Sequence, residues 1–376
     1  MKYKLGEICE IVSGSTPKTN IDEYWDGTLK WITPAEITDD SYIIEDSVRK
    51  ITELGVKKTG LTSFPTGTVI LSSRAPIGKV AIAGCEMYCN QGFKNLICSD
   101  KINNRYLYWF LKGNTRYLNS LGRGATFKEI SKGIVSEIVI NVPDIISQEK
   151  AANNLERISQ IIKLRKRELE VLDVLIKARF VELFGNIREE QLLEDISEFV
   201  TVGIANSATH AYVESGIPML RNQNIKENYL DDTDLIYIKP EFAAKYESKK
   251  LKENDIIAMR TGYPGIACLV PKKYEGCQTF TTLIVRLKAE NNPSYVCSYI
   301  NSDLGKRFIE SGKVGVAQQN FGAKSLAKMP IKIAPKELQD EYADFVKQVD
   351  KSKVAIQKSL EKMQLLFDSL MQKYFC

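Results

Sequence analysis

The sequence is poor in the residue types and motifs that catalytic centres most often use. It contains a single histidine, His210, and imidazole is the usual general base near neutral pH. Because His210 lies in a short polar stretch, we expect it to be an exposed loop residue. No glycine-rich loop ends in Gly-Lys-Ser or Gly-Lys-Thr, since Val80 follows Gly78 and Lys79, so nucleotide hydrolysis is not indicated. The glycine fingerprint and the Asn/Asp-Pro-Pro-aromatic cluster of adenine methyltransferases are absent too.

Long apolar runs are also missing. No stretch of about 18 consecutive apolar residues is present, so no membrane-spanning helix is expected. The opening residues, 1–7, lack the apolar core of a signal peptide. We therefore expect a soluble, cytoplasmic protein.

The cysteines form no framework of close pairs. They lie mostly in apolar surroundings, which predicts reduced, buried thiols at positions 9, 85, 89, 98, 268, 277, 297 and 376. Only Cys85 and Cys89 are close enough in sequence to suggest a metal site. A structural zinc ion needs four ligands, and His210 is the sole histidine, so we expect no metal and no cofactor in this chain.

The sequence contains an internal repeat. With 376 residues and 44% apolar content it is long enough for two domains, and its second half repeats the first at an offset of about 188 residues. The matching segments keep the same order: 5–12 with 193–200, 31–37 with 219–225, 67–74 with 254–261, Gln91 and 96–97 with Gln278 and 283–284, and 138–143 with 330–335. Each half begins with short β-branched runs that are typical of strands.

Each half ends in a long segment without glycine or proline, at about 147–184 and 337–375. Apolar residues recur there at helical spacing, which predicts two long helices. The steps of three and four residues are those of a coiled-coil seam, formed by Leu155, Ile158, Ile162, Leu169, Leu172 and Ile176 in the first helix and by Val349, Ile356, Met363, Phe367 and Leu370 in the second. Polar residues such as Arg165 and Ser352 interrupt this seam.

One such helix could simply lie on its own domain. A helix of about 38 residues spans roughly 57 Å, however, which is longer than a small domain is wide. If a pseudo-twofold axis relates the two halves, the helices pair antiparallel. The sequence thus predicts recognition domains at 1–146 and 187–336, with spacer helices at 147–186 and 337–376.

Positive charge gathers at the same place in both halves. Residues 1–56 hold 6 basic and 11 acidic residues, whereas 57–132 hold 12 and 3; residues 187–244 hold 4 and 11, whereas 245–332 hold 15 and 7. Such charges can be merely solvated and locally paired. Their recurrence favours a surface that binds nucleic acid, because neutralising phosphates requires clustered basic residues.

Within and beside these segments lie side chains that can read base edges, since arginine matches guanine and asparagine or glutamine matches adenine in the major groove. Composition does not distinguish base contacts from phosphate contacts. The candidate DNA-binding residues are Arg74, Lys79, Asn90, Gln91, Lys94, Arg123 and Lys128 in the first half and Arg221, Asn222, Gln223, Arg260, Gln278, Lys313, Gln318 and Gln319 in the second. The loops at 122–126 and 313–319 contain glycine and a basic residue at equivalent positions.

Taken together, these features resemble the specificity subunit of type I restriction-modification systems over essentially the whole chain. The features are the opening Leu-Gly-Glu-Ile at 5–8, the strand at 67–74 with Gly78, the loop at 124–126, Val142-Pro143 followed by Gln148-Glu149, and the long helix that follows. The second half departs from this pattern at 261–262 and 334–339.

The resemblance implies an α+β fold of two pseudo-symmetric target recognition domains, joined by two long antiparallel helices that form a coiled coil. In that family each domain reads one half of a split duplex DNA sequence, and the helices set the gap. It also implies two methyltransferase subunits that use S-adenosylmethionine, and ATP- and Mg-dependent restriction subunits. A methylated adenine must be swung out of the duplex, and this chain lacks a pocket motif for that step, so catalysis is expected in the partners.

Two alternatives of another class remain at this stage. A structural scaffold could hold two protein-binding domains, although the repeated basic segments argue against it. A fused methyltransferase-nuclease could contain this chain as its specificity part, although the missing methyl-donor and metal motifs argue against a complete enzyme.

Overall fold

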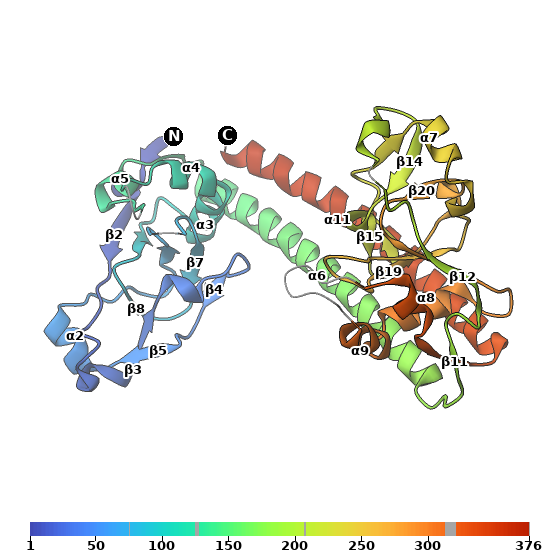
Figure 1. The fold of residues 1–376 in the computed structure, drawn as a ribbon. Helices are drawn as coiled ribbons and strands as arrows, with labels where there is room; N and C mark the ends of the chain where they lie inside the picture. The colour runs from blue at the N-terminus through green and yellow to red at the C-terminus, as the bar shows by residue number, and fades with distance from the viewer. Residues whose placement is uncertain (75, 125–127, 207, 313–320, 376) are drawn as a thin grey trace. The chain divides into compact units, whose positions relative to one another are not determined.

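The computed structural model describes residues 1–74, 76–124, 128–206, 208–312 and 321–375. The chain divides into two compact units, unit 1 (residues 1–166 and 358–376) and unit 2 (residues 167–357). Two long helices, α6 (Ile145–Phe184) and α11 (Lys336–Phe375), each contribute one part to each unit. Figure 1 shows both as continuous helices, which confirms their prediction from the sequence. The boundaries predicted between recognition domains and spacer helices stay a prediction.

Unit 1 is built around a five-stranded sheet of order β2-β9-β6-β7-β4. Its strands are β2 (Cys9–Ser13), β4 (Ile43–Ile44), β6 (Val69–Leu71), β7 (Val80–Ala83) and β9 (Lys94–Cys98). The smaller sheets are β5-β3-β8, of β3 (Trp25–Ile32), β5 (Arg49–Ile51) and β8 (Tyr88–Cys89), and the pair β1 (Lys2–Lys4) with β10 (Val139–Asn141). The short helices are α1 (Leu5–Ile8), α2 (Glu53–Thr59), α3 (Asn104–Gly113), α4 (Thr115–Ser120) and α5 (Lys132–Ser136), with 3-10 turns η1 (Asp22–Tyr24) and η2 (Pro34–Glu36).

Unit 2 contains a four-stranded sheet of order β12-β21-β18-β19. Its strands are β12 (Ser197–Val202), β18 (Ile256–Ala258), β19 (Ala267–Leu269) and β21 (Leu283–Leu287). The other strands are β13 (Tyr212–Val213), β14 (Ile217–Leu220), β17 (Ile236–Ile238) and β20 (Gln278–Thr279) in one sheet, and the pairs β15 (Ile225–Lys226) with β16 (Tyr229–Leu230) and β11 (Glu190–Leu192) with β22 (Pro330–Lys332). The short helices are α7 (Pro240–Ala244), α8 (Pro293–Asn301), α9 (Asp303–Ser311) and α10 (Ala323–Ala327), with 3-10 turns η3 (Thr209–Ala211), η4 (Asn222–Asn224), η5 (Glu247–Lys249) and η6 (Lys272–Tyr274).

The two units share one topology, which confirms the internal repeat. The order β2-β9-β6-β7 in unit 1 corresponds to β12-β21-β18-β19 in unit 2, and the parallel pair β3-β8 corresponds to β14-β20. A positive backbone φ angle also recurs at equivalent glycines. Gly78 and Gly265 both lie in the left-handed region, with φ of 91° and 94°, so both turns favour glycine.

The last turns of each long helix complete the core of one unit. Phe375 of α11 packs on Tyr106 of α3 in unit 1, with ring centroids 4.9 Å apart. Phe184 of α6 packs on Tyr295 of α8 in unit 2, with ring centroids 4.4 Å apart. Both tyrosine hydroxyls donate hydrogen bonds to a backbone carbonyl of the equivalent strand, β10 or β22. The same contact between a phenylalanine of a long helix and a tyrosine of a short helix thus occurs in both units.

A buried glutamine ties the start of each long helix to its unit. Gln148 accepts a hydrogen bond from the Asn103 backbone N–H at 2.8 Å, and Gln339 accepts one from Asn292 at 2.8 Å. Both asparagines cap the following helix, α3 or α8, with their side chains. Each glutamine is 1% exposed and donates back to the loop before its own helix. The departure at 334–339 therefore leaves the glutamine in place: Gln339 stands where Gln148 does, although Ala334 and not a proline accepts its hydrogen bond.

The long helices run antiparallel within each unit. In unit 1 the Asn154 amide donates to the Tyr374 hydroxyl at 3.0 Å. In unit 2, Asp173 pairs with Lys353 at 2.6 Å and Arg179 pairs with Glu341 at 2.5 Å. All eleven predicted seam residues are buried or half-buried, and Leu155, Ile158, Ile176 and Val349 are the buried ones. Ile162 and Leu169, the seam residues on either side of Arg165, are only half-buried.

Two of the sequence matches were displaced. Tyr88 pairs in parallel with Trp31 as Gln278 does with Met219, so Gln278 is equivalent to Tyr88 and not to Gln91. The segment between β19 and β20, which holds η6, is longer than that between β7 and β8 and shifts the register. Near the end, the strand pairing matches Val139 with Pro330, one residue away from the sequence match.

In the part of the chain that the structure describes, no helix combines the length and apolarity that a membrane span requires.

Candidate nucleic-acid interface

The predicted DNA-binding residues of unit 1 lie mainly on loops that the sheet holds together at one end. We call the described residues of these loops, 14–16, 33–36, 72–74, 76–79, 89–94, 123–124 and 128–130, loop cluster 1. Backbone hydrogen bonds join them: Ser73 N–H donates to Gly92 at 2.7 Å, and Ile130 N–H donates to Ser73 at 2.9 Å. The Lys79 ammonium group reaches the Pro34 carbonyl at 3.3 Å. Distant segments of sequence thus form one site.

Glu129 pairs with two basic side chains of loop cluster 1. Its carboxylate accepts a hydrogen bond from Arg74 Nε at 2.9 Å and contacts Lys94 Nζ at 3.3 Å. Burial alone would raise the pKa of Glu129, but the hydrogen bonds and charges of Arg74 and Lys94 outweigh it, and the pKa lies below its ordinary value. A charged Glu129 therefore fixes the Arg74 guanidinium by its inner nitrogen. Arg74 is exposed, and its outer nitrogens are directed to no carboxylate among the described residues.

The other candidates of unit 1 surround this pair. Arg123 is joined to Glu129 through two backbone hydrogen bonds of 3.0 Å, and its side chain is exposed, as is that of Lys128. The exposed Gln91 accepts a hydrogen bond from Thr16, and the half-buried Asn90 accepts one from the Gly92 backbone at 2.9 Å. The structure thus brings all seven predicted residues of unit 1 into one loop cluster.

In unit 2 the equivalent loops form loop cluster 2, the described residues 203–205, 221–224, 259–265, 279–282 and 321. Asn222 links two of these loops: its carbonyl oxygen accepts from Arg260 N–H at 3.1 Å, and its amide donates to the Thr261 hydroxyl at 3.0 Å. The Phe321 N–H donates to the Arg260 carbonyl at 3.0 Å, as Ile130 N–H does to Ser73 in unit 1. The backbone frames of the two clusters are equivalent.

A carboxylate also anchors one arginine and one glutamine of loop cluster 2. Arg221 donates to the carboxylate of Asp234 at 3.1 Å and to its carbonyl at 3.0 Å, and Gln223 donates to the same carboxylate. Sequence reasoning missed Asp234 and Glu129, since it searched for basic and amide side chains alone. A signal existed for Glu129, which is the only acidic residue between positions 101 and 136.

Two of the candidates are buried. Lys94 is 6% exposed, and its ammonium group is held by Ser73, the Phe93 carbonyl and Glu129. Gln278 is 0% exposed, and its amide donates to two backbone carbonyls, that of Ala243 within α7 and that of Tyr246 just after it. Direct contact of either side chain with DNA is therefore wrong for this conformation. Three further candidates, Lys313, Gln318 and Gln319, lie outside the described residues.

Part of the basic excess serves the interior of each unit. Arg286 forms an ion pair of 2.6 Å with Asp255, whose side chain is 2% exposed. Lys249 donates to the carbonyls of Val202 and Gly203 at 2.8 Å each. In unit 1, Lys112 donates to the Asp39 carbonyl and the Tyr108 hydroxyl. The net positive charge of a segment is thus larger than the charge available at its surface.

Loop cluster 2 also holds a strained backbone position. Thr281 has a φ of 54°, a left-handed conformation that a β-branched side chain adopts only when its surroundings impose it. Hydrogen bonds to the neighbouring loops hold it there, since Thr281 N–H donates to Ile204 at 2.9 Å and Ile204 N–H donates to Thr279 at 2.7 Å. Strain of this kind gathers at functional sites.

Comparisons with known proteins agree with this arrangement. A family model described as "Type I restriction modification DNA specificity domain" matches residues 1–173 and again 189–365. The MjaIX specificity subunit of Methanocaldococcus jannaschii is 40% identical over 186 residues, which cover 49% of this chain and 42% of that subunit. The EcoBI specificity subunit of Escherichia coli is 20% identical over 314 residues, covering 73% of this chain and 66% of the relative. The chain thus spans from under half to about two thirds of these curated relatives.

Solved structures share the fold. The S subunit of a type I restriction-modification system from M. genitalium superposes with a TM-score of 0.61 at 16% sequence identity, covering 100% of this chain and 96% of that one. A second structure, from work on complex assembly and conformational transition of a type I R-M system, gives a TM-score of 0.62 at 16% identity, covering 100% and 97%. The chain belongs to the type I restriction modification DNA specificity family, and it contains the family's domain twice.

Proposed function

We propose that this chain binds duplex DNA and supplies the sequence specificity of a type I restriction-modification complex. Loop cluster 1 reads one half of a bipartite target and loop cluster 2 reads the other. The long helices set the gap between the half-sites and dock methyltransferase subunits. The protein acts in the cytoplasm, together with those subunits and with ATP-dependent restriction subunits.

One observation carries this proposal: the same loop frame is built twice, with different side chains on it. Arg74 in unit 1 and Arg221 in unit 2 are each anchored by a carboxylate while their loops remain at the surface. An anchored arginine loses less side-chain entropy when it contacts a phosphate or a guanine. Two equivalent frames with different side chains suit a target whose two halves differ in sequence.

The long helices carry exposed apolar residues that suit docked partner helices. On α6 within unit 2, Val171, Val174 and Val181 are all exposed, Val174 at 64% and Val181 at 66%. Within unit 1, Leu164 of α6 and Leu365 of α11 are 67% and 71% exposed. Apolar side chains repeated along a helix at this exposure favour contact with another apolar surface.

The sequence supports placing catalysis in the partners. It lacks the motifs that bind a methyl donor and an extruded adenine, so S-adenosylmethionine is expected in the methyltransferase subunits. ATP and Mg are expected in the restriction subunits. This chain then contributes binding, orientation and the choice of site.

Two measurements on the purified chain test the proposal. The affinity for genomic DNA fragments, measured by fluorescence anisotropy, should fall steeply as salt rises, because phosphate contacts release counterions. Methyl transfer from labelled donor should occur only when a type I methyltransferase subunit is added to this chain. A protein scaffold would show no salt-dependent duplex binding, and a complete enzyme would methylate DNA alone; either result would contradict the proposal.

A further inference from the structure

One aromatic side chain at the surface of loop cluster 2 has no role in the function proposed above. Tyr263, in the loop between β18 and β19, is 75% exposed. It is the only exposed aromatic residue among the described residues of either loop cluster, since Phe93, Phe280 and Phe321 are buried or half-buried. An apolar ring left in water at a binding surface gains free energy when the partner covers it.

The tip of this loop is narrow and firmly rooted. The Tyr263 N–H donates to the Thr261 carbonyl at 3.1 Å, which makes the turn tight. The residue before the ring is the exposed Gly262, and a Cβ atom placed there would meet nothing within 4 Å among the described residues. The residue after the ring, Pro264, is buried. The ring of Tyr263 therefore stands on a slender turn.

Unit 1 has an exposed ring at the equivalent place. The N–H groups of Gly78 and Gly265 donate to the carbonyl of the first residue after β6 and β18, at 3.1 and 3.0 Å. The two loops are equally long, so Pro76 is equivalent to Tyr263, and Pro76 is exposed as well. An exposed ring thus precedes the left-handed glycine in both copies, and unit 2 carries the larger, aromatic one.

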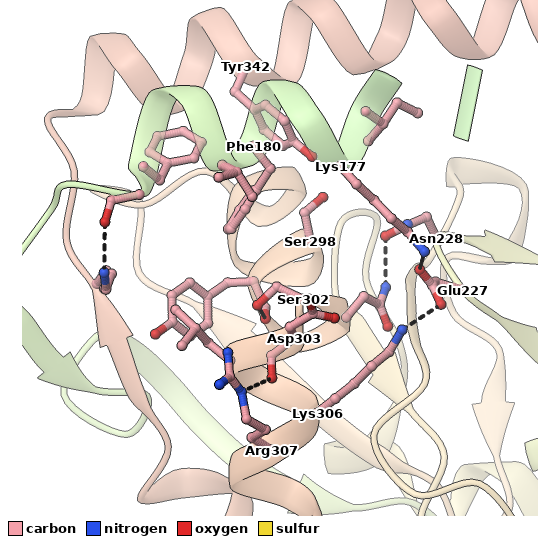
Figure 2. Close-up of a pocket in the computed structure, with 18 residues that line it drawn as sticks. Lys177, Phe180, Glu227, Asn228, Ser298, Ser302, Asp303, Lys306, Arg307 and Tyr342 are labelled. Atoms are coloured by element: carbon pink, nitrogen blue, oxygen red, sulfur yellow. Dashed lines mark hydrogen bonds and ion pairs between the residues drawn. The ribbon is translucent and has the colours of Figure 1, made fainter. Parts of the chain in front are cut away.

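The frame behind Tyr263 is fixed. The side chain of Asn222 holds the loop through the two hydrogen bonds described above. The strand pair that follows Asn222 is held in turn by Glu227, on the turn between β15 and β16. Figure 2 shows Glu227 bound to Lys177 of α6, at 3.0 Å, and to Lys306 of α9, at 2.9 Å. A side chain presented by a fixed frame binds without first ordering its loop.

Duplex DNA offers an apolar ring few places to bind. Phosphates and sugars form its outer surface, and each base face is covered by its neighbour in the stack. Proteins that open the stack insert apolar side chains between base pairs and kink the duplex by about 20–90°. The proposed function requires an opened stack, because an adenine is methylated only after it leaves the duplex. A slender, fixed aromatic tip suits insertion better than contact with phosphates.

We propose that Tyr263 inserts its ring between base pairs of the half-site that loop cluster 2 reads, and holds the stack open there. The exposed base faces then stack on the ring, which replaces part of the stacking that the opening removes. Arg221 and Gln223 read this half-site, whereas Tyr263 deforms it. The inference rests on the proposed function, since it requires loop cluster 2 to bind duplex DNA.

The test uses duplexes that carry the target found by methylome sequencing, with 2-aminopurine in place of one adenine at a time. The fluorescence of 2-aminopurine rises when the base loses its stacked neighbours. The full chain is added without a methyltransferase subunit, so that base extrusion by that subunit does not contribute. Wild type and Tyr263→Phe, which keeps the aromatic ring, should raise the fluorescence at one step of the target, and Tyr263→Ala should not.

Two further measurements follow the same variants. Energy transfer between dyes on the two duplex ends should report a kink with wild type and Tyr263→Phe, and a straighter duplex with Tyr263→Ala. Duplex affinity should fall by about 5- to 100-fold in Tyr263→Ala, the loss of one stacked aromatic ring. Tyr229→Ala is the matched control, because Tyr229 is 59% exposed and lies outside both loop clusters. It should change neither signal.

Loss of the fluorescence rise and of the kink in Tyr263→Ala, at an unchanged melting temperature, supports the inference. A wild type that binds its target without either signal overturns it, because the ring then lies outside the stack. Signals that Tyr263→Ala keeps overturn it as well. The same holds if Tyr263→Ala binds DNA normally but loses affinity for a methyltransferase subunit, which assigns the ring to a protein contact. A wild type that binds no duplex DNA contradicts the proposed function itself, and the inference with it.

Discussion

Ser73 in unit 1 and Arg260 in unit 2 occupy the same place in the backbone, since each carbonyl accepts a hydrogen bond from the loop that follows the helices. Their side chains have nothing in common. Arg74 comes next in unit 1 and Thr261 in unit 2, while Arg221 stands on the loop where unit 1 has Thr33. The comparison separates the backbone hydrogen bonds that build the frame, which are alike, from the side chains on the loops, which differ.

The frame positions are alike where a buried polar group has no freedom. Gln148 and Gln339 keep the same three roles: they accept from a capping residue, donate to the loop before the helix and fill a buried site. A buried donor or acceptor left without a partner costs about 1–3 kcal/mol. Such a cost holds a residue in place through both copies, whereas an exposed loop side chain is under no such constraint.

The largest expected effect comes from breaking that frame. Gln148→Leu and Gln339→Leu each remove an acceptor and a donor from a buried site, so each should lower stability by about 2–4 kcal/mol. Hydrogen exchange should locate the loss: protection falls in unit 1 for Gln148→Leu and in unit 2 for Gln339→Leu. Unequal losses, or a loss in the wrong unit, would show that the two residues are not equivalent. Gln160→Leu, an exposed change on α6, is the control.

An intermediate effect is expected at the two arginines that a carboxylate anchors in the loops. Arg74→Ala and Arg221→Ala should each lower duplex DNA affinity by about 5- to 50-fold and reduce the slope of log affinity against log salt. Fluorescence anisotropy across a salt series measures both quantities. Arg167→Ala serves as the control, because that exposed arginine pairs with Glu170 on α6 and lies outside both loop clusters. If the control lost as much affinity as the two variants, the clusters would not be the DNA-binding surface.

The smallest effect concerns the carboxylate behind Arg74. The folded-state pKa of Glu129 lies below its ordinary value of 4.5, so its ion pairs stabilise the protein above that value. This stabilisation is lost as the pH falls from about 4.5 through the lowered folded-state pKa. Glu129→Gln should therefore melt below the wild type at pH 7, and the difference should shrink below pH 4.5. Melting curves from pH 3 to 7 measure it, and a difference that is constant with pH would refute the assignment.

The sequence predicted the repeat, the two long helices and their seam, because these depend on periodic apolar residues and on segments without glycine or proline. It misplaced Gln278, because the inserted turn with η6 shifts the register and two glutamines invite a false match. It also placed Lys94 at the surface. Which lysine is buried depends on Glu129, a partner 35 residues away in sequence, and no local pattern reports that contact.

Sequencing the methylated sites of a host that expresses this chain with its methyltransferase tests the central claim most directly. The informative variant exchanges residues 1–146 for the corresponding domain of another family member. The account predicts a bipartite motif in which one half changes while the other half and the gap between them are preserved. A motif without a gap, or one in which both halves change together, would contradict the claim that the two recognition domains read their half-sites independently.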